Sequence, residues 1–350
     1  SRERNDVLVK NTSSDHGSFY SWLASQPEIK AAIYPLTKTP RTVYNKNMEN
    51  AIEIKNLKKS YGDTLAVDNL SFTVGKGELF AFLGVNGAGK STAISIICGT
   101  LAKDCGEVFV CGENADENPA SIAKKIGVVF QYSALDKTLS VRDNLLSRAA
   151  LYGICGKNAE KRISALAEKL GFTDLLPKTL GKLSGGQRRK IDVARALVHN
   201  PGILILDEPT TGLDPQTRKT LWNFVSTLRK DENMTIFLTT HYMEEAADAD
   251  RVIILNKGKI AAEGTPLELK NKYTGDFVTL YSVSEEDVKS LNLPFEKTIG
   301  GYRVEVKNTA AAKDLIISRP EIFGDFEITK GKMDDVFLAV TGIKAGENVQ

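Results

Sequence analysis

The chain has 350 residues, of which 42% are hydrophobic and 26% are charged, and its formal net charge is +2. These values are typical of a folded protein of two or three domains, and the small net charge gives no general attraction to nucleic acid or anionic lipid. No apolar run approaches the roughly 20 residues that cross a membrane as a helix, so a pore would have to be formed by another polypeptide.

The first 47 residues contain Ser, Thr, Asn, Lys and scattered aromatic residues, but no apolar core long enough for a signal peptide. Residues 19–33 could form a helix with Trp22 and Leu23 on one face. From Ala51 to Val74, apolar and polar residues alternate. This alternation predicts half-buried antiparallel strands in a small sheet.

Residues 79–83 are apolar and predict a buried strand, and residues 91–99 predict a helix. Between them the sequence GVNGAGKST, residues 84–92, matches the pattern G-x-x-x-x-G-K-[ST] of a phosphate-binding loop. Its glycines allow backbone N–H groups to face one anion, and the helix N-terminus adds its positive dipole end. We expect Lys90 to reach the terminal phosphates of a nucleotide and the Ser91 hydroxyl to bind Mg²⁺. The alternative is a plain glycine turn, which does not account for the strand–loop–helix context.

Three further apolar stretches predict strands that end in polar residues: Gln131 after residues 126–130, Asp207 and Glu208 after 203–206, and His241 after 236–240. Ligands bind at the carboxyl ends of buried parallel strands. We expect Asp207 to hold Mg²⁺ through water, and Glu208 to activate or orient the water that attacks the γ-phosphate. His241 is expected to contact the γ-phosphate. Gln131 is expected to contact Mg²⁺ or the attacking water.

Each of these residues has a plainer alternative. Two solvated acids at a strand end, a structural histidine and a surface glutamine are all common. His16 and His199 are interpreted as structural. The phosphate-binding loop favours the functional interpretation of Asp207, Glu208 and His241, because these residues would complete its site.

The sequence LSGGQ, residues 183–187, precedes a helical pattern of apolar residues that continues to Leu197. The Ser-Gly-Gly segment would then open a helix whose free N-terminal amides form another anion site. One fold rarely needs two such sites for one nucleotide, so we expect the second to contact the nucleotide of a neighbouring molecule. The alternative is a serine N-cap on a glycine-rich turn. The basic run at 188–190 is interpreted as a solvated helix face, and residues 132–198 as mostly helical.

Taken together, these motifs resemble those of the nucleotide-binding subunit of an ABC transporter. GVNGAGKST is similar to the Walker A motif, LSGGQ to the signature motif, and ILILDEP, residues 203–209, to the Walker B motif with its adjacent glutamate. Residues 211–214 resemble the D-loop, Gln131 the Q-loop and His241 the H-loop. Tyr61 resembles the aromatic residue that stacks on adenine, with a strand-edge tyrosine as the alternative. Walker A and LSGGQ in this order are very specific, whereas the A-loop, Q-loop and D-loop are weak alone.

The resemblance implies ATP and Mg²⁺ as ligands and assigns roles to the matching residues. The catalytic residues are Glu208, His241, Lys90 and Gln131. Mg²⁺ is assigned to Ser91, Gln131 and Asp207. The nucleotide is assigned to Tyr61, Gly84, Asn86, Gly87, Ala88, Gly89, Lys90, Ser91, Thr92, Ser184, Gly185, Gly186, Gln187 and Asp214.

The implied fold is α/β, with a RecA-like P-loop core, an antiparallel β subdomain and an α-helical subdomain at about 132–200. Together these would form an ABC ATPase domain over residues 48–266. Residues 1–47 are interpreted as a tag or an extension outside the working ATPase, and the rival interpretation is an authentic extension that docks on a partner. Two such subunits are expected to pair head to tail, with ATP between the Walker A motif of one and the LSGGQ of the other. Hydrolysis then removes the γ-phosphate that holds the pair together.

Residues 267–350 predict a separate α+β domain, with strands at 278–283, 302–306 and 326–328 and helices at 285–291, 310–318 and 333–340. Its ending, residues 333–342, resembles the terminus common in daunorubicin-resistance-type ATPases, which power ABC-2 exporters. The resemblance implies an exporter motor that is peripheral at the cytoplasmic face of the cell membrane. Its implied partners are integral membrane permease subunits and a second ATPase subunit, either a copy or a paralogue, with no nucleic acid.

The main alternative is a soluble ABC ATPase that acts on ribosomes or DNA rather than in transport. Ribosome-acting relatives usually carry two cassettes in one chain, and chromosome-maintenance relatives carry long coiled coils. This sequence has one copy of each motif and no heptad run of useful length. A small-molecule kinase with a P-loop would leave LSGGQ and His241 unexplained. The motifs carry no information about the cargo.

Overall fold

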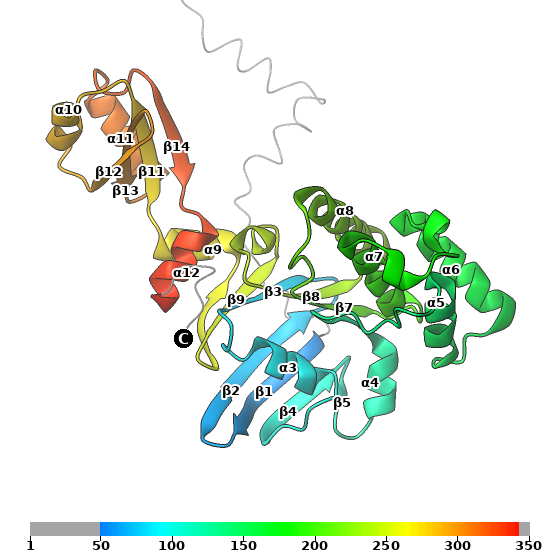
Figure 1. Cartoon of the computed structure of the whole chain (residues 1–350). Helices are drawn as coiled ribbons and strands as arrows, with labels where there is room; N and C mark the ends of the chain where they lie inside the picture. Colours follow the sequence, from blue (N-terminus) through cyan, green and yellow to red (C-terminus); the bar gives the residue numbers. More distant parts are fainter. Residues whose placement is uncertain (1–49, 343–350) are drawn as a thin grey trace, which may run out of the picture. The chain divides into compact units, whose positions relative to one another are not determined.

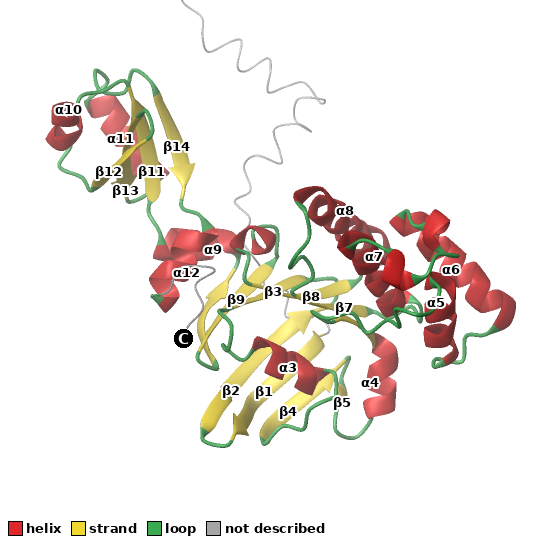
Figure 2. Cartoon of the chain, in the orientation of Figure 1, coloured by secondary structure: helices red, strands yellow, loops and turns green. Residues whose placement is uncertain are grey.

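The computed structural model describes residues 50–342, so the helix expected at 19–33 and His16 lie outside the described residues. Three sheets and their covering helices make up this part of the chain (Figures 1 and 2). The α/β class expected from the sequence is confirmed. Across residues 50–342, no helix is both long and apolar enough to span a membrane.

The central sheet has the order β10-β9-β3-β8-β7-β6, and only the β9–β10 pair is antiparallel. Its strands are β3 (Leu79–Leu83), β6 (Ile126–Val129), β7 (Ile203–Asp207), β8 (Thr235–Thr240), β9 (Arg251–Asn256) and β10 (Lys259–Gly264). Every residue of β3, β7 and β8 is buried, as expected where both faces of a parallel sheet are covered. Strands β9 and β10 form an antiparallel hairpin.

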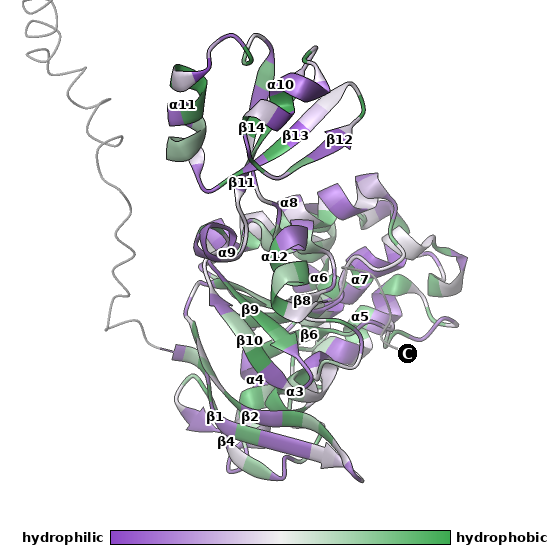
Figure 3. Cartoon of the chain, turned by 90° about the vertical axis from the view of Figure 1, so that its left-hand side faces the viewer, coloured by the Kyte–Doolittle hydropathy of each residue, from purple (hydrophilic) through white to green (hydrophobic). Residues whose placement is uncertain are grey.

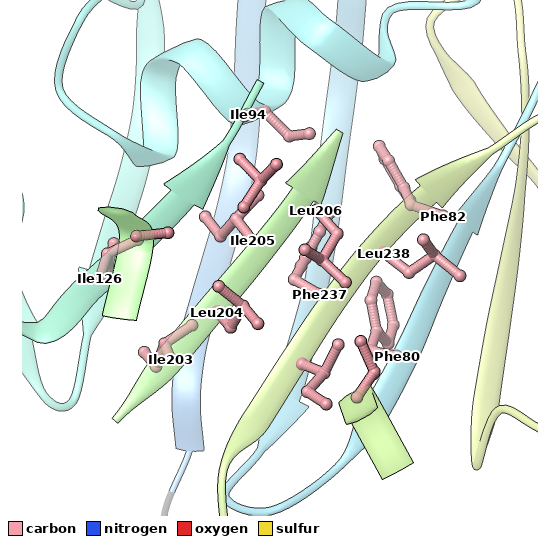
Figure 4. Packing of buried hydrophobic residues seen from close by; sticks show 14 of the residues in the cluster. Phe80, Phe82, Ile94, Ile126, Ile203, Leu204, Ile205, Leu206, Phe237 and Leu238 are labelled. Carbon is pink, nitrogen blue, oxygen red and sulfur yellow. The ribbon is translucent and has the colours of Figure 1, made fainter. Parts of the chain in front are cut away.

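The second sheet is antiparallel and has the order β2-β1-β4-β5. Its strands are β1 (Asn50–Tyr61), β2 (Thr64–Gly75), β4 (Cys105–Val110) and β5 (Glu113–Asn114). The alternation from Ala51 to Val74 therefore predicted β1 and β2 correctly, whereas β4 and β5 were not predicted. Aromatic rings tie β2 to the central sheet, because Phe72 stacks on Phe80 of β3 with ring centroids 5.4 Å apart and an interplanar angle of 8°. Phe80 in turn packs against Phe237 of β8, at 5.1 Å (Figure 4).

Helices cover the central sheet and extend beyond its β6 edge (Figure 2). They are α3 (Lys90–Ile97), α4 (Pro119–Lys125), α5 (Val141–Ala150), α6 (Gly156–Leu170), α7 (Gly185–Leu197) and α8 (Pro215–Glu232). The mostly helical segment expected at 132–198 is confirmed as α5, α6 and α7, with short 3₁₀ turns between the last two. Helix α6 buries Ile163, Leu166 and Leu170 on one face, as an amphipathic helix does.

Helix α7 covers the outer edge of β6, the edge strand of the central sheet. Two side chains of α7 and that of His199, which follows the helix, contact alternate carbonyl oxygens of residues 130, 128 and 126: Arg189 Nη1 at 2.6 Å, Arg195 Nη2 at 2.7 Å and His199 Nε2 at 3.2 Å. Gly127 permits this approach, because a Cβ atom there would lie 2.3 Å from the carbonyl oxygen of Ala196. Side chains of α7 thus satisfy the open edge that another strand would otherwise occupy.

The remaining elements are α9 (Pro266–Tyr273), β11 (Asp276–Tyr281), α10 (Glu285–Ser290), β12 (Phe295–Thr298), β13 (Gly301–Val306), α11 (Thr309–Ser318), β14 (Phe326–Lys330) and α12 (Met333–Thr341). The third sheet has the order β12-β13-β11-β14 with all neighbours antiparallel, which is the split β-α-β arrangement. It has a core of its own, which includes Val278, Leu280 and Val304. Strand β12 was not predicted.

The last helix does not pack in that small core. Met333, Val336 and Phe337 of α12 are buried in the larger core, and α12 contacts α9, β9 and β10. Figure 3 shows hydrophobic residues on β9 and in α12 in green. The sequence analysis placed α12 in the separate α+β domain of residues 267–350, called the accessory domain below. The amphipathic pattern of α12 shows that one face is buried, but not against which core. The domain boundaries at 47 and 266 remain predictions.

Candidate nucleotide site

The loop between β3 and α3 holds a lysine inside it. Gly89 caps α3 with φ of 104°, and a Cβ atom there would lie 2.4 Å from the carbonyl oxygen of Ala66 on β2. Lys90 follows as the first helical residue and is only 5% exposed. Its ammonium donates to the carbonyl oxygens of Gly84 at 2.7 Å and Val85 at 3.2 Å. Burial lowers the pKa of Lys90, while the neighbouring carboxylates of Glu208 and Asp207 oppose that shift.

The strand-end residues meet as the parallel topology predicted. Glu208 directly follows β7, and its carboxylate lies 3.7 Å from Lys90 Nζ and 3.4 Å from His241 Nδ1. The amide of Gln131, which comes just after β6, donates to the same carboxylate at 3.2 Å. His241 Nδ1 makes no hydrogen bond, although it lies close to the Glu208 carboxylate. Three of the residues assigned to catalysis therefore converge on the carboxyl group of the fourth.

The backbone at Glu208 has φ of 46°, in the left-handed region that residues other than glycine seldom adopt. The Glu208 N–H donates to the carbonyl oxygen of Thr239 at 3.0 Å, which holds the turn against β8. Strained backbone of this kind persists only where the surroundings fix it. The turn aims the Glu208 side chain toward Lys90, away from the direction that a continued strand would give it.

Asp207, the last residue of β7, presents a carboxylate next to this turn. It is buried, and Thr239 Oγ1 donates to its carboxylate at 2.5 Å. Burial raises the pKa of Asp207, whereas the hydroxyls of Thr239 and Ser91 and the Lys90 ammonium lower it. A carboxylate and a hydroxyl fit Mg²⁺, which prefers oxygen ligands and usually binds through one or two carboxylates together with phosphates. The structure brings Ser91 and Asp207 together, whereas the amide nitrogen of Gln131 is directed to Glu208.

A cleft of about 380 Å³ lies beside the loop between β3 and α3. It is lined by Ala66, Asn86, Gly87, Gly89, Lys90, Ser91, Thr92, Gln131 and Glu208. Most of the predicted loop contacts therefore share one cleft with Gln131 and Glu208, whereas Asp207 and His241 do not line it. Tyr61 does not line it. Its side chain is 51% exposed at the end of β1, with the Lys59 ammonium 5.9 Å from the ring centroid, and its contact with adenine remains a prediction.

The LSGGQ residues and Asp214 form a separate group. Ser184 caps α7, and its hydroxyl accepts from the Gln187 N–H at 3.2 Å while the Gln187 side chain accepts from the Ser184 N–H at 3.0 Å. This capping box leaves the amides of Gly185 and Gly186 as the available donors. Asp214 caps α8, because its carboxylate accepts a hydrogen bond from the Thr217 N–H. The Thr217 side chain packs against Gly186 and leaves no room for a Cβ atom there. None of these residues lines the cleft around Lys90.

Three side chains that support the site were not predicted. Arg189, interpreted from sequence as solvated, is buried and donates to main-chain carbonyl oxygens at the ends of β6 and β7. Thr239 bridges Asp207 and Glu208. The buried carboxylate of Glu245 accepts from the hydroxyls of Thr210 and Thr240. Their partners are distant in sequence or are backbone atoms, so no spacing rule could have found them.

Comparisons with known proteins show which family the sequence and the fold resemble. The family model described as ABC transporter matches residues 67–211. The chain is 35% identical over 306 residues to "Nod factor export ATP-binding protein I" of Rhizobium sp. (strain N33), covering 83% of this chain and 97% of that protein. A protein of the same name from Burkholderia thailandensis is 39% identical over 246 residues, covering 70% of this chain and 81% of that protein.

Solved structures give the same result. A cbiO1 subunit from Clostridium perfringens, described as part of the ABC transporter complex cbiONQ, has a TM-score of 0.59 at 28% identity, covering 63% of this chain and 90% of that chain. The ATP-binding cassette MJ0796, dimeric and bound to ADP and Pi, has a TM-score of 0.57 at 28% identity, covering 61% of this chain and 98% of that chain.

Proposed function

Because the chain belongs to the ABC transporter family of ATP-binding proteins and is an ATPase subunit of a transporter, we propose that it powers export as a head-to-tail dimer on separate membrane permease subunits. The curated relatives named above are exporter subunits by name, which supports the direction of transport. Their cargo is not carried over to this chain. The position that follows is peripheral, at the cytoplasmic face of the membrane.

The observation that carries the proposal is the convergence of Lys90, Gln131 and His241 on the Glu208 carboxylate, at 3.7, 3.2 and 3.4 Å. In the proposed reaction Glu208 orients the attacking water or accepts its proton, and Lys90 neutralises charge on the terminal phosphates. His241 and Gln131 hold the γ-phosphate and the water in position, and positioning of this kind supplies much of the catalysis of phosphoryl transfer.

Ser91 and Asp207 would hold Mg²⁺, which neutralises charge on the phosphates when it is bound. The buried Asp207 carboxylate supports this assignment, because burial has raised its pKa and a divalent cation would stabilise its charged form. The residues of this chain then fix the cation on one side only. The nucleotide would provide further oxygen ligands.

The proposed second subunit accounts for the LSGGQ group. The donors at Gly185 and Gly186 open α7 at a position that does not line the cleft of this chain. In a head-to-tail pair they would contact the γ-phosphate bound to the other subunit, as would the Ser184 hydroxyl. The rival, a soluble ABC ATPase that acts on ribosomes or DNA, is disfavoured by the export names of the curated relatives.

The variant Glu208→Gln tests this proposal. It keeps the shape of the side chain but removes the base, so turnover should fall roughly 10²- to 10⁴-fold. ATP should then accumulate between two subunits, and light scattering after size exclusion should show an ATP-dependent dimer. Glu168→Gln, on the exposed face of α6, is the control and should behave as the wild type. Phosphate release by Glu208→Gln at the wild-type rate, or a variant that stays monomeric with ATP, would contradict the proposal.

A further inference from the structure

Arg189 lies between two groups of functional residues. It is 8% exposed, and its guanidinium donates to four main-chain carbonyl oxygens: Phe130 at 2.6 Å, Pro209 at 2.7 Å, Glu208 at 3.1 Å and Asp207 at 3.3 Å. Within residues 50–342 it forms no ion pair with a carboxylate. A buried cation is costly unless it is hydrogen-bonded. The planar fork of an arginine can serve carbonyl groups on two strands at once.

The four carbonyl groups belong to the segments that carry Gln131 and Glu208. Phe130 immediately precedes Gln131, and residues 207–209 form the left-handed turn that directs the Glu208 side chain into the cleft. The guanidinium therefore sets the separation of these two segments, on which the contact between Gln131 and Glu208 depends. Arg189 itself does not line the cleft, so it can act on the reaction only through these residues.

Arg189 also belongs to the helix that begins with the LSGGQ residues. It lies five residues after Ser184, which at 1.5 Å per residue is about 7.5 Å along α7. A second side chain of α7, Asp192, accepts a hydrogen bond from Ser133, two residues beyond Gln131, at 2.9 Å. Helix α7 is thus connected both to the segment after β6 and to the turn after β7.

We propose that Arg189 is a positioning residue that couples the two nucleotide sites of the dimer. When the start of α7 engages the nucleotide held by the other subunit, Arg189 carries any shift of α7 to Glu208 and Gln131 of its own chain. This inference rests on the proposed function, because it requires two subunits. Binding at one site then favours the hydrolysing arrangement at the other, and such coupling between sites is reciprocal.

A purely structural role for Arg189 makes different predictions. An arginine that only satisfied carbonyl groups would change the stability of the fold and leave the dependence of rate on ATP concentration unaltered. The chain contains such an arginine at the far end of α7. Arg162 donates to the carbonyl oxygen of Leu197 at 3.0 Å and to the Asn200 side chain at 2.8 Å, and neither residue carries a functional group of the site.

The experiment measures ATPase rate against ATP concentration for the full chain, for Arg189→Gln and for Arg162→Gln as the matched control. The wild type and Arg162→Gln should show a Hill coefficient above 1. Arg189→Gln should lose cooperativity and fall in kcat by roughly 10- to 100-fold, the cost of a small misplacement of catalytic groups. Its affinity for ATP, measured by nucleotide fluorescence, should change by less than about threefold, because Arg189 does not line the cleft.

Arg189→Lys keeps the cation but cannot serve four carbonyl groups at once, so its kcat and its Hill coefficient should lie between those of the wild type and Arg189→Gln. It is used in place of Arg189→Gln if thermal melting shows that the glutamine variant is unfolded. A folded variant that retains the wild-type kcat and Hill coefficient overturns the inference alone. A wild-type chain that never dimerises with ATP overturns the proposed function, and this inference with it.

Discussion

The N-termini of α3 and α7 are both opened by glycine, yet their surroundings differ. At α3 no side chain caps the helix, and a buried lysine, two carboxylates, a histidine and a glutamine gather beside it. At α7 the capping box of Ser184 and Gln187 satisfies two of the amides, and the site is exposed. The first site has the charges that a nucleotide requires, whereas the second has donors only. Such a site is useful to a ligand that is already held by other groups.

Removal of the charge at the α3 site should have the largest effect. Lys90→Ala should reduce kcat/KM for ATP roughly 10³-fold, because a buried cation aimed at the phosphates is lost. Its free energy of unfolding should not fall, because burial already disfavours the charged form of Lys90. Chemical denaturation and phosphate release together distinguish loss of function from loss of the fold.

Lys125→Ala serves as the control for this change, because it removes an ion pair with Glu113 that lies outside the cleft. It should leave kcat/KM within about twofold of the wild type, as the loss of an exposed pair usually changes little. Equal activity of the Lys90 and Lys125 variants would remove the contrast between the two helix N-termini.

A change at the α7 site should have a smaller effect, and one of a different kind. Ser184→Ala should leave the affinity of a single chain for ATP unchanged but reduce ATPase activity roughly 10²-fold, because we propose that the hydroxyl contacts the phosphate bound to the other subunit. It also removes a helix cap, which costs about 1 kcal/mol of stability. Nucleotide titration at low protein concentration and turnover at high concentration measure the two effects separately.

Ser284→Ala is the control for the stability that Ser184→Ala loses with its helix cap. Ser284 caps α10 in the accessory domain through the same contact with a backbone N–H, at 3.1 Å. This variant should lose similar stability and keep its full ATPase activity. If Ser184→Ala also turned over ATP undiminished, the second site would be no more than a helix cap.

The smallest effect is expected where α7 packs on β6. It should appear as a dependence of the free energy of unfolding on pH. Burial lowers the pKa of His199 from 6.5 to about 4, and nearby arginines add to the shift. The fold therefore favours neutral His199, and the unfolded chain gains a proton as the pH falls below 6.5. The free energy of unfolding should fall by about 1–2 kcal/mol between pH 7.5 and 5 through this group.

The variant His199→Gln should lack that part of the pH dependence while keeping a donor for the Ile126 carbonyl group. Urea denaturation of the wild type and the variant at both pH values gives the difference directly. The same slope in both proteins would mean that His199 is not held in its neutral form by the fold.

The sequence sufficed for those parts of the site that depend on local pattern or on simple topology. The Walker A segment carries its own strand, turn and helix, and parallel strands bring their carboxyl ends to one edge, so the meeting of Gln131, Glu208 and His241 could be expected. The buried position of Arg189 could not be expected, since a basic run on a helix is usually solvated. Its partners here are backbone carbonyl groups, which every residue has. The capping role of Gln187 was not predicted, although its spacing of three residues after Ser184 is the pattern of a capping box.

The packing of α12 has a consequence for how the chain is organised. Helices α9 and α12 contact each other on the larger core, and the split β-α-β domain occupies the chain between them. The domain thus enters and leaves at adjacent points, which is the topology of an insertion. The larger core closes around α9 and α12 and needs none of residues 274–332 to complete its own packing. Those residues could be exchanged for another module, or replaced by a short linker, without rerouting the polypeptide through the rest of the molecule.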